Sequence, residues 1–238
     1  MANGIYAALS GAAAQAQALD MVSNNLANAP TTGFKSQHMT FEEVLIDVEG
    51  VANETQRQVR VDEVYTKFSQ GSVRETGNPL DVALTGEGFF VVDTPNGPRY
   101  TRDGHFSVTE EGLLVNVQGL EVQGDGGPIT LLPNEKARIT GDGHVMSNGI
   151  NLGTLRRVNF EDPQGLIREG HNLWKAPDGV IPEESEVRLQ ARSLEGSNVN
   201  VVEAMTDMVW IARAYEVFNR AVETFREVDE RTATQITG

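Results

Sequence analysis

Four histidines could bind a metal ion or transfer a proton, and they are dispersed along the chain as His38, His105, His144 and His171. No two of them stand four residues apart, the spacing that places two imidazoles on one helix face for zinc. His105 and His144 follow turns in two similar short motifs, so a shared ligand role competes with the simpler role of polar residues at strand starts, which we favour. The chain has no cysteine, which excludes disulfides and thiolate sites. The pattern predicts no metal and no cofactor.

The 34 Asp and Glu residues could supply the two nearby carboxylates that a glycosidase needs. Asp81 and Asp93 flank apolar segments and are the first candidates, although solvated surface charge explains acidic residues equally well. The sequence has no Gly-x-Ser-x-Gly elbow, no P-loop and no glycine-rich fingerprint between a strand and a helix. We therefore predict no enzymatic activity, and expect Asn at either position to affect folding or assembly alone.

The charge of the chain argues against several partners. A formal net charge of −15 would repel a phosphate backbone, so nucleic acid is excluded as a partner. No window approaches the roughly 20 apolar residues of a membrane span, and no cleavable secretion signal is visible. If the protein leaves the cytoplasm, we expect another export route.

Residues 3–28 are predicted to form one amphipathic helix. Apolar and small residues recur there at steps of three and four: Ile5, Leu9, Ala12, Ala16, Leu19, Val22 and Leu26. Asn28 and Pro30 should end the helix. Gly33 then permits a turn with positive φ, and burial of Phe34 should hold that turn in place. Residues 1–35 thus form a helix and a turn.

The middle of the chain changes character twice. Residues 36–76 are weakly patterned and polar, which we interpret as an extended linker or arm. Residues 77–192 show period-two patterning and frequent turn dipeptides, which predict a mostly antiparallel β domain built of short hairpins. The dipeptides expected to supply positive φ are Asn96-Gly97, Asp103-Gly104, Asp142-Gly143, Asn148-Gly149 and Asp178-Gly179.

Residues 193–238 are predicted to contain a second long helix, beginning after an Asn200 N-cap. Its apolar residues follow a heptad seam: Val201, Ala204, Met208, Ile211, Tyr215, Phe218, Val222 and Phe225. Over residues 200–232 this helix would be about 48 Å long, too long for the β domain to cover. We therefore expect an α+β fold in which the terminal helices pair as a coiled-coil-like helical domain, with each other, with other subunits, or both. In the isolated chain the seam should be exposed.

Three segments resemble flagellar rod and hook proteins. The stretch from Ser23 to Lys35, which includes Asn25, Asn28, Gly33 and Phe34, is similar to their N-terminal signature. Gly196 to Glu203, followed by Ala214-Tyr215-Glu216, is similar to their C-terminal signature. Segments 79–90 and 100–104 look like the β segments of the same family, so the resemblance covers nearly the whole chain.

The resemblance implies a structural subunit of the flagellar basal-body rod that assembles through its terminal helices into the torque-transmitting drive shaft. Within the family the chain looks most like the proximal rod proteins, with the distal rod as alternative. The implied partners are other copies of the chain, neighbouring rod proteins and the flagellar export apparatus. Export would be followed by folding in the periplasm. A competing interpretation of another class is an exported carbohydrate-active or binding protein with a helical stalk.

Overall fold

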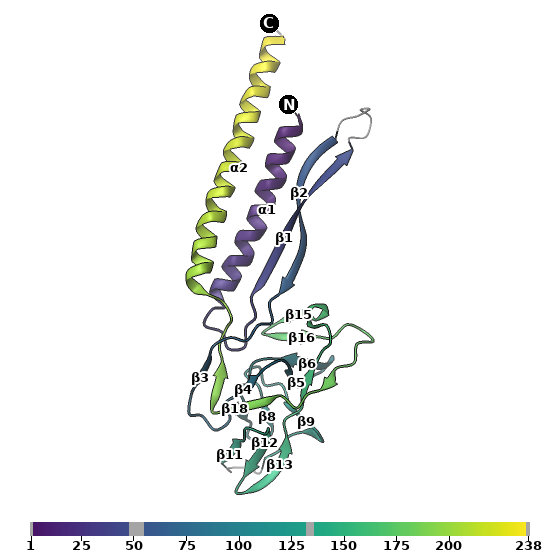
Figure 1. Ribbon diagram of the computed structural model, residues 1–238, viewed down its shortest axis with the longest axis vertical. Coiled ribbons are helices and arrows are strands. Elements are labelled where there is room, and N and C mark those ends of the chain that lie inside the picture. The colour runs from purple at the N-terminus through teal and green to yellow at the C-terminus, as the bar shows by residue number, and fades with distance from the viewer. Residues whose placement is uncertain (1, 48–54, 132–135, 237–238) are drawn as a thin grey trace. The chain divides into compact units, whose positions relative to one another are not determined.

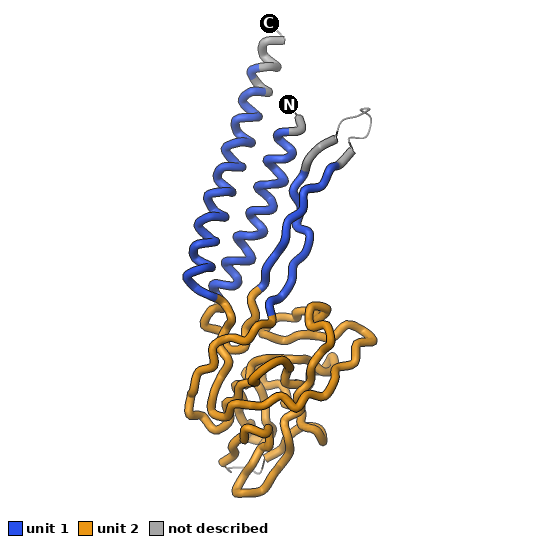
Figure 2. The backbone as a smooth tube through the Cα atoms, in the orientation of Figure 1, with its two compact units in different colours: residues 1–27, 37–67, 200–238 blue, residues 28–36, 68–199 orange. Residues whose placement is uncertain are grey.

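The computed structural model describes residues 2–47, 55–131 and 136–236. The chain divides into two compact units, each assembled from separate stretches of sequence (Figure 2). Unit 1 contains residues 1–27, 37–67 and 200–238, and unit 2 contains residues 28–36 and 68–199. The two predicted helices thus belong to one unit, whereas the turn after the first helix belongs to the other.

Unit 1 consists of two long helices and one long hairpin, which lie side by side (Figure 1). Helix α1 spans Ala2–Ala27 and packs against both helix α2, Val201–Ile236, and the hairpin. The hairpin is formed by antiparallel strands β1, Gln37–Asp47, and β2, Thr55–Thr66. The segment expected to be an extended linker or arm, residues 36–76, thus contains a paired hairpin: the alternating valines of β2 pair with β1, and Val59 and Val61 are half-buried.

The two helices of unit 1 run antiparallel and approach closely where α1 has glycine. A Cβ atom added at Gly4 would lie 2.7 Å from the Phe225 ring, and one added at Gly11 would lie 2.6 Å from the Phe218 ring. From the first pair to the second, the residue number on α1 rises by seven and the residue number on α2 falls by seven. The heptad seam of α2 therefore docks its phenylalanines into gaps that glycine leaves on α1.

This packing corrects one expectation about the seam. Val222 is buried, and Ile211 and Phe218 are half-buried in the single chain, because α1 covers this face of α2. Of the seam, only Val201 and Tyr215 are exposed, at 40% and 36%. The first turn of α2 follows the predicted N-cap, since Oδ1 of Asn200 accepts hydrogen bonds from the Val202 and Glu203 backbone N–H groups at 3.1 and 3.4 Å.

Unit 2 is the predicted β domain, and every strand pairing within its described residues is antiparallel. Its largest sheet has the strand order β15-β16-β6-β5-β14-β17. The strands of this sheet are β5 Phe89–Thr94, β6 Gly97–Thr101, β14 Arg157–Asn159, β15 Ile167–Gly170, β16 Leu173–Lys175 and β17 Glu183–Glu184. The α+β class is thus confirmed.

Smaller pairings complete unit 2, in the orders β18-β4, β19-β3, β7-β8, β9-β10 and β11-β12-β13. One short 3₁₀ helix spans Pro163–Gly165. The remaining strands are β3 Val73–Glu75, β4 Val82–Thr85, β7 Ser107–Val108, β8 Leu114–Val115, β9 Gln123–Gly124, β10 Gly127–Pro128, β11 Ala137–Ile139, β12 His144–Ser147, β13 Ile150–Thr154, β18 Arg188–Ala191 and β19 Ser193–Glu195.

Strand β5 is the centre of the unit 2 core because it is buried on both faces. Phe90 and Val92 point into one apolar cluster, and Phe89 and Val91 point into a second cluster around Trp174. A strand covered on both sides has a continuous apolar run, which explains the sequence Phe-Phe-Val-Val.

The turn dipeptides behave as predicted with one exception. Asn96-Gly97 joins β5 to β6 and Asn148-Gly149 joins β12 to β13, with φ of +98° at Gly97 and +84° at Gly149. The prediction for Asp103-Gly104 is wrong, since Gly104 does not have positive φ. Glycine is required at position 104 for space: a Cβ there would lie 1.7 Å from the carbonyl oxygen of Val82.

Candidate assembly surfaces

The structure shows where the candidate residues for catalysis and metal binding lie and what they contact. Asp81 is buried, and its carboxylate accepts hydrogen bonds from Oγ1 of Thr76 at 2.6 Å and Nδ2 of Asn78 at 2.7 Å, with Nδ1 of His105 at 2.9 Å. Asp93 is exposed on β5. His144 instead contacts Thr154. Among the described residues no cluster of three His, Asp or Glu side chains could hold a metal ion.

The residues predicted for the helix interface fall into three classes of burial. Ala12, Ala204 and Val222 are buried. Leu9, Val201 and Tyr215 are exposed. The others are half-buried: Ile5, Ala16, Leu19, Leu26, Met208, Ile211, Phe218 and Phe225. The face of α1 that is most buried consists of smaller residues than the predicted stripe and includes Ala8, Gly11, Ala14 and Ala18.

A second apolar surface on α2 was missed by the sequence analysis. We call it the outer stripe: Val202, Met205, Val209, Trp210 and Val217. Val202 is 74% and Trp210 is 68% exposed, which are large values for such side chains. Most residues of the outer stripe stand two positions before, or one or two positions after, a seam residue. Because successive residues of a helix are about 100° apart, these offsets place the outer stripe on the side of α2 opposite the seam. It runs for about 23 Å along the first half of α2.

The last residue of the outer stripe, Val217, also lines an apolar groove within unit 1. The groove has a volume of about 390 Å³ and is lined by residues of α1, α2 and the hairpin: Ala7, Ala8, Glu43, Gln58, Val59, Val217, Phe218 and Ala221. Small residues form most of its α1 wall. The outer stripe and the groove both expose apolar surface, which is a usual property of a protein interface. No helix within the described residues is both long and apolar enough to cross a membrane.

Asn25 of the N-terminal signature fixes the exit of α1. Its side-chain Nδ2 donates to the Gln37 carbonyl oxygen at 2.7 Å, and its Oδ1 accepts from the Gln37 N–H at 2.9 Å. The amide thus satisfies both backbone groups of the first residue of β1. Further along, the Thr31 N–H donates to the Asn28 carbonyl oxygen at 3.0 Å, which closes the turn after the helix.

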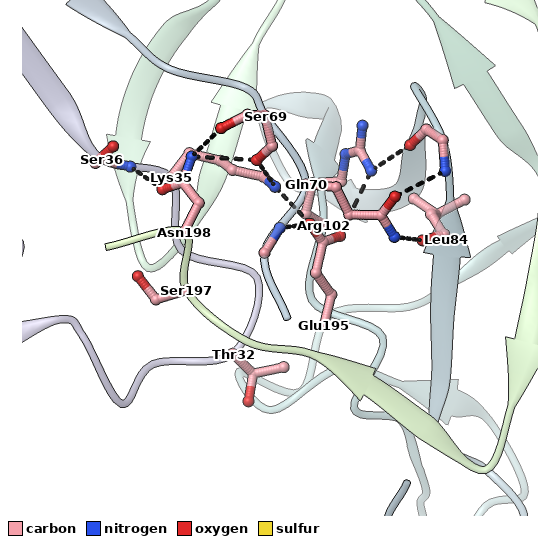
Figure 3. A network of polar contacts seen from close by, with 12 residues as sticks. Thr32, Lys35, Ser36, Ser69, Gln70, Leu84, Arg102, Glu195, Ser197 and Asn198 are labelled. Carbon is pink, nitrogen blue, oxygen red and sulfur yellow. Dashed lines mark hydrogen bonds and ion pairs between the residues drawn. The ribbon is translucent and has the colours of Figure 1, made fainter. Parts of the chain in front are cut away.

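The signature turn in unit 2 is held by residues at and just before the start of the C-terminal signature (Figure 3). The Gly33 N–H donates to the Glu195 carbonyl oxygen at 2.8 Å, and the Ser36 N–H donates to Oδ1 of Asn198 at 2.8 Å. Phe34 is fully buried, with the guanidinium of Arg168 4.5 Å from its ring centre. The predicted positive φ is present, at +68° for Gly33.

Three charged side chains meet beside this turn, and we call them the buried triad. Nζ of Lys35 donates to Oε1 of Glu195 at 2.5 Å and to the Ser69 carbonyl oxygen at 2.9 Å. Nη1 of Arg102 donates to the Gly86 carbonyl oxygen at 2.7 Å and lies 3.5 Å from Oε2 of Glu195. Burial lowers the pKa of Lys35, and the adjacent carboxylate partly offsets this effect. Lys35 and Arg102 lie in the family-like segments 23–35 and 100–104, but their burial could not be predicted because a single charge in a sequence carries no sign of burial.

Substitutions at Gly33 test the turn. We expect Gly33→Ala to lower the free energy of unfolding by about 1–3 kcal/mol, and Gly33→Val to lower it further, because the position combines positive φ with backbone contact. A Cβ there would lie 2.6 Å from the backbone nitrogen of Asp103. Gly77→Ala is the matched control, since Gly77 has φ of +78° and nothing within 4 Å of its Cβ position. Chemical denaturation of the three variants checks this, and equal losses for Ala at positions 33 and 77 would contradict it.

Comparison with known proteins gives matches along most of the chain. Residues 5–35 match the model described as "Flagella basal body rod protein". Residues 83–147 match "Flagellar hook protein FlgE/F/G D1 domain", and residues 190–236 match "Flagellar basal body rod FlgEFG protein C-terminal". The first and third matches contain the two segments that meet in the signature turn.

Three similar proteins align with the chain over at least 90% of their own length. The chain is 34% identical to the flagellar basal-body rod protein FlgF of Mesorhizobium japonicum, over 91% of this chain and 90% of that protein. It is 33% identical to FlgF of Caulobacter vibrioides, over 99% and 98% of the two chains. Identity to the flagellar basal-body rod protein FlgG of Borreliella burgdorferi is 31%, over 94% and 95%.

Proposed function

Because the chain belongs to the flagellar basal-body rod protein family and is a structural subunit of the rod, we propose that it joins neighbouring subunits through unit 1. The observation that carries this proposal is the outer stripe of α2, which stays exposed after the seam on the opposite face has been covered by α1. The seam then serves assembly indirectly, because it holds the two helices as one coiled-coil-like pair. Exposed Leu9 of α1 and the exposed seam residues Val201 and Tyr215 are also available to neighbours.

The proposed occupants of the outer stripe and groove are helices of neighbouring rod subunits, both copies of this chain and other rod proteins. Helices that pack through apolar faces and small residues approach closely, which suits a tube of parallel subunits transmitting torque. A heterologous contact of this kind, repeated without closure, produces a helical filament. The acidic composition of the chain keeps the unassembled subunit soluble.

A proximal position in the rod is favoured by the resemblance found in the sequence. The identities of 34% and 33% to proteins named FlgF, against 31% to one named FlgG, support this assignment, with the distal rod as alternative. We further propose that the chain passes through the flagellar export apparatus and folds in the periplasm, as the resemblance to rod proteins implies.

Trp210→Asp tests the outer stripe. Because Trp210 is largely exposed in the single chain, we expect the free energy of unfolding to change by no more than about 0.5 kcal/mol. Burying the new carboxylate against an apolar neighbour would cost several kcal/mol, so rod assembly and swimming should be lost. Thr224→Asp is the control, because it places the same charge at an exposed site beyond the stripe.

The measurements are thermal unfolding of the purified chain, swimming, and recovery of rods from cells that carry each variant. Normal rods with Trp210→Asp would show that the outer stripe is not an interface. Loss of rods with both substitutions would show that any added charge on α2 is harmful, and would equally remove the support for this surface.

A further inference from the structure

We propose that residues 193–198 act as a strap that closes unit 2 last, by bringing the carboxylate of Glu195 to two buried cations. The side chains of Lys35 and Glu195 are 0% exposed, and that of Arg102 is 2% exposed. Lys35 and Glu195 are separated by 160 residues in sequence. The strap therefore unites the two ends of unit 2 through its most deeply buried charges.

The strap is bound along its length to residues 69–75. Strand β19 pairs with β3, and the Gly196 N–H then donates to the Ser72 carbonyl oxygen at 2.8 Å. Asn198 donates through Nδ2 to the Ser69 carbonyl oxygen at 3.1 Å. A Cβ atom at Gly71 would lie 2.1 Å from the Gly196 carbonyl oxygen, so the two backbones touch. These contacts form together when the strap docks.

Because of the charges of the buried triad, the signature turn can be buried only when the strap is docked. Lys35 and Arg102 are two cations with one carboxylate between them, and that carboxylate also accepts the Gly71 N–H at 2.9 Å. A buried cation without an anion is far more costly than a paired one. Until Glu195 arrives, Lys35 is therefore more stable in water than inside unit 2, and the turn that carries it stays open.

Much of the core forms from residues closer in sequence. The cluster that contains Phe90 and Val145 includes the hairpins β5–β6 and β12–β13, and one long-range pairing, β18 with β4, adds Leu189 to it. Local contacts close small loops and form early, whereas joining residues 160 apart closes a large one. The strap should consequently dock after the transition state for folding.

This order has a consequence that rests on the proposed function. A chain delivered from its N-terminal end, during synthesis or through a narrow export channel, cannot complete unit 2 until residue 198 is free. Among the described elements, α2 follows the strap. Late closure would thus keep unit 2 of a rod subunit open until residues 1–198 have been delivered.

The test is the folding kinetics of the full-length chain carrying Glu195→Gln. The sequence has two tryptophans, so a Trp210→Phe background leaves Trp174, which is fully buried in unit 2, as the fluorescent reporter. If the strap docks after the transition state, Glu195→Gln should raise the unfolding rate at least about tenfold and change the folding rate less than about twofold. Glu184→Gln is the control, since that side chain is 83% exposed on β17.

Two results would overturn the proposal. One is a folding rate that falls in proportion to the lost stability, because it would place the strap in the folding nucleus. The other is no change in either the folding rate or the unfolding rate. If Glu195→Gln cannot be recovered folded, hydrogen exchange of the unaltered chain decides the question. The Gly33 and Gly196 amides should then exchange through a local opening of lower free energy than the opening that exposes the amides of β5. If these two amides exchange only by global unfolding, the strap is refuted. Neither readout involves rods, so failure here leaves the proposed function standing.

Discussion

Phe218→Asp is expected to unfold unit 1 while unit 2 remains folded. The ring of Phe218 fills the space that Gly11 leaves on α1, where even one added carbon would lie within 2.6 Å of it. Replacing the ring removes apolar burial and introduces a carboxylate without a partner, a combined loss of about 3–5 kcal/mol. Unit 2 has its own apolar clusters and should keep its stability.

Far-UV circular dichroism and Trp174 fluorescence separate the two effects of Phe218→Asp, and every Trp174 measurement uses the Trp210→Phe background because Trp210 belongs to unit 1. Helical signal should be lost at lower denaturant than in the unaltered chain, with the transition seen by Trp174 unchanged. The adjacent substitution Val217→Asp is the control, because Val217 is 65% exposed on the outer stripe and should leave both transitions in place. Loss of the Trp174 transition with Phe218→Asp would contradict the independence of the two units.

Gly104→Ala is expected to have the opposite pattern, with unit 2 lost and unit 1 retained. The added methyl group would lie 1.7 Å from the Val82 carbonyl oxygen and 3.2 Å from the Phe90 ring, and backbone cannot move aside as a flexible side chain can. The Val82 N–H also donates to the Gly104 carbonyl oxygen at 3.1 Å, so separation of the two segments costs a hydrogen bond. We expect a loss of about 3 kcal/mol or more.

Denaturation followed at Trp174 measures the effect of Gly104→Ala. Gly126→Ala is matched to it, since Gly126 has no unusual φ and nothing lies within 4 Å of its Cβ position. That control should be neutral or slightly stabilising. Equal stability of the two variants would mean that Gly104 is not in contact with Val82.

The sequence predicts the long-range organisation well where periodicity is strong. Both helices, the antiparallel β region and the Asn200 N-cap follow from spacing and local hydrogen-bonding chemistry. The hairpin of β1 and β2 was missed because its residues are largely polar and its strands depend on pairing with each other. Strand formation of that kind is a tertiary effect that local patterns carry weakly.

The candidate surfaces were harder to predict for a physical reason. A heptad seam shows that a helix has a partner, but the spacing does not say whether the partner is in the same chain. Gly4 and Gly11 decide it, because their missing side chains accept Phe225 and Phe218. The buried triad was equally hidden, since the partner of Lys35 is 160 residues away.

Density for isolated basal bodies is the most direct test of the central claim that this chain is a structural subunit of the rod. A small folded protein inserted between Gly126 and Gly127, at the open turn of β9 and β10, enlarges the subunit with little disturbance. Maps from cells carrying the enlarged and unaltered chains should differ by added density on the rod, at its proximal end, with both cell lines assembling rods. Complete rods without added density, from cells that produce the enlarged chain, would contradict the account.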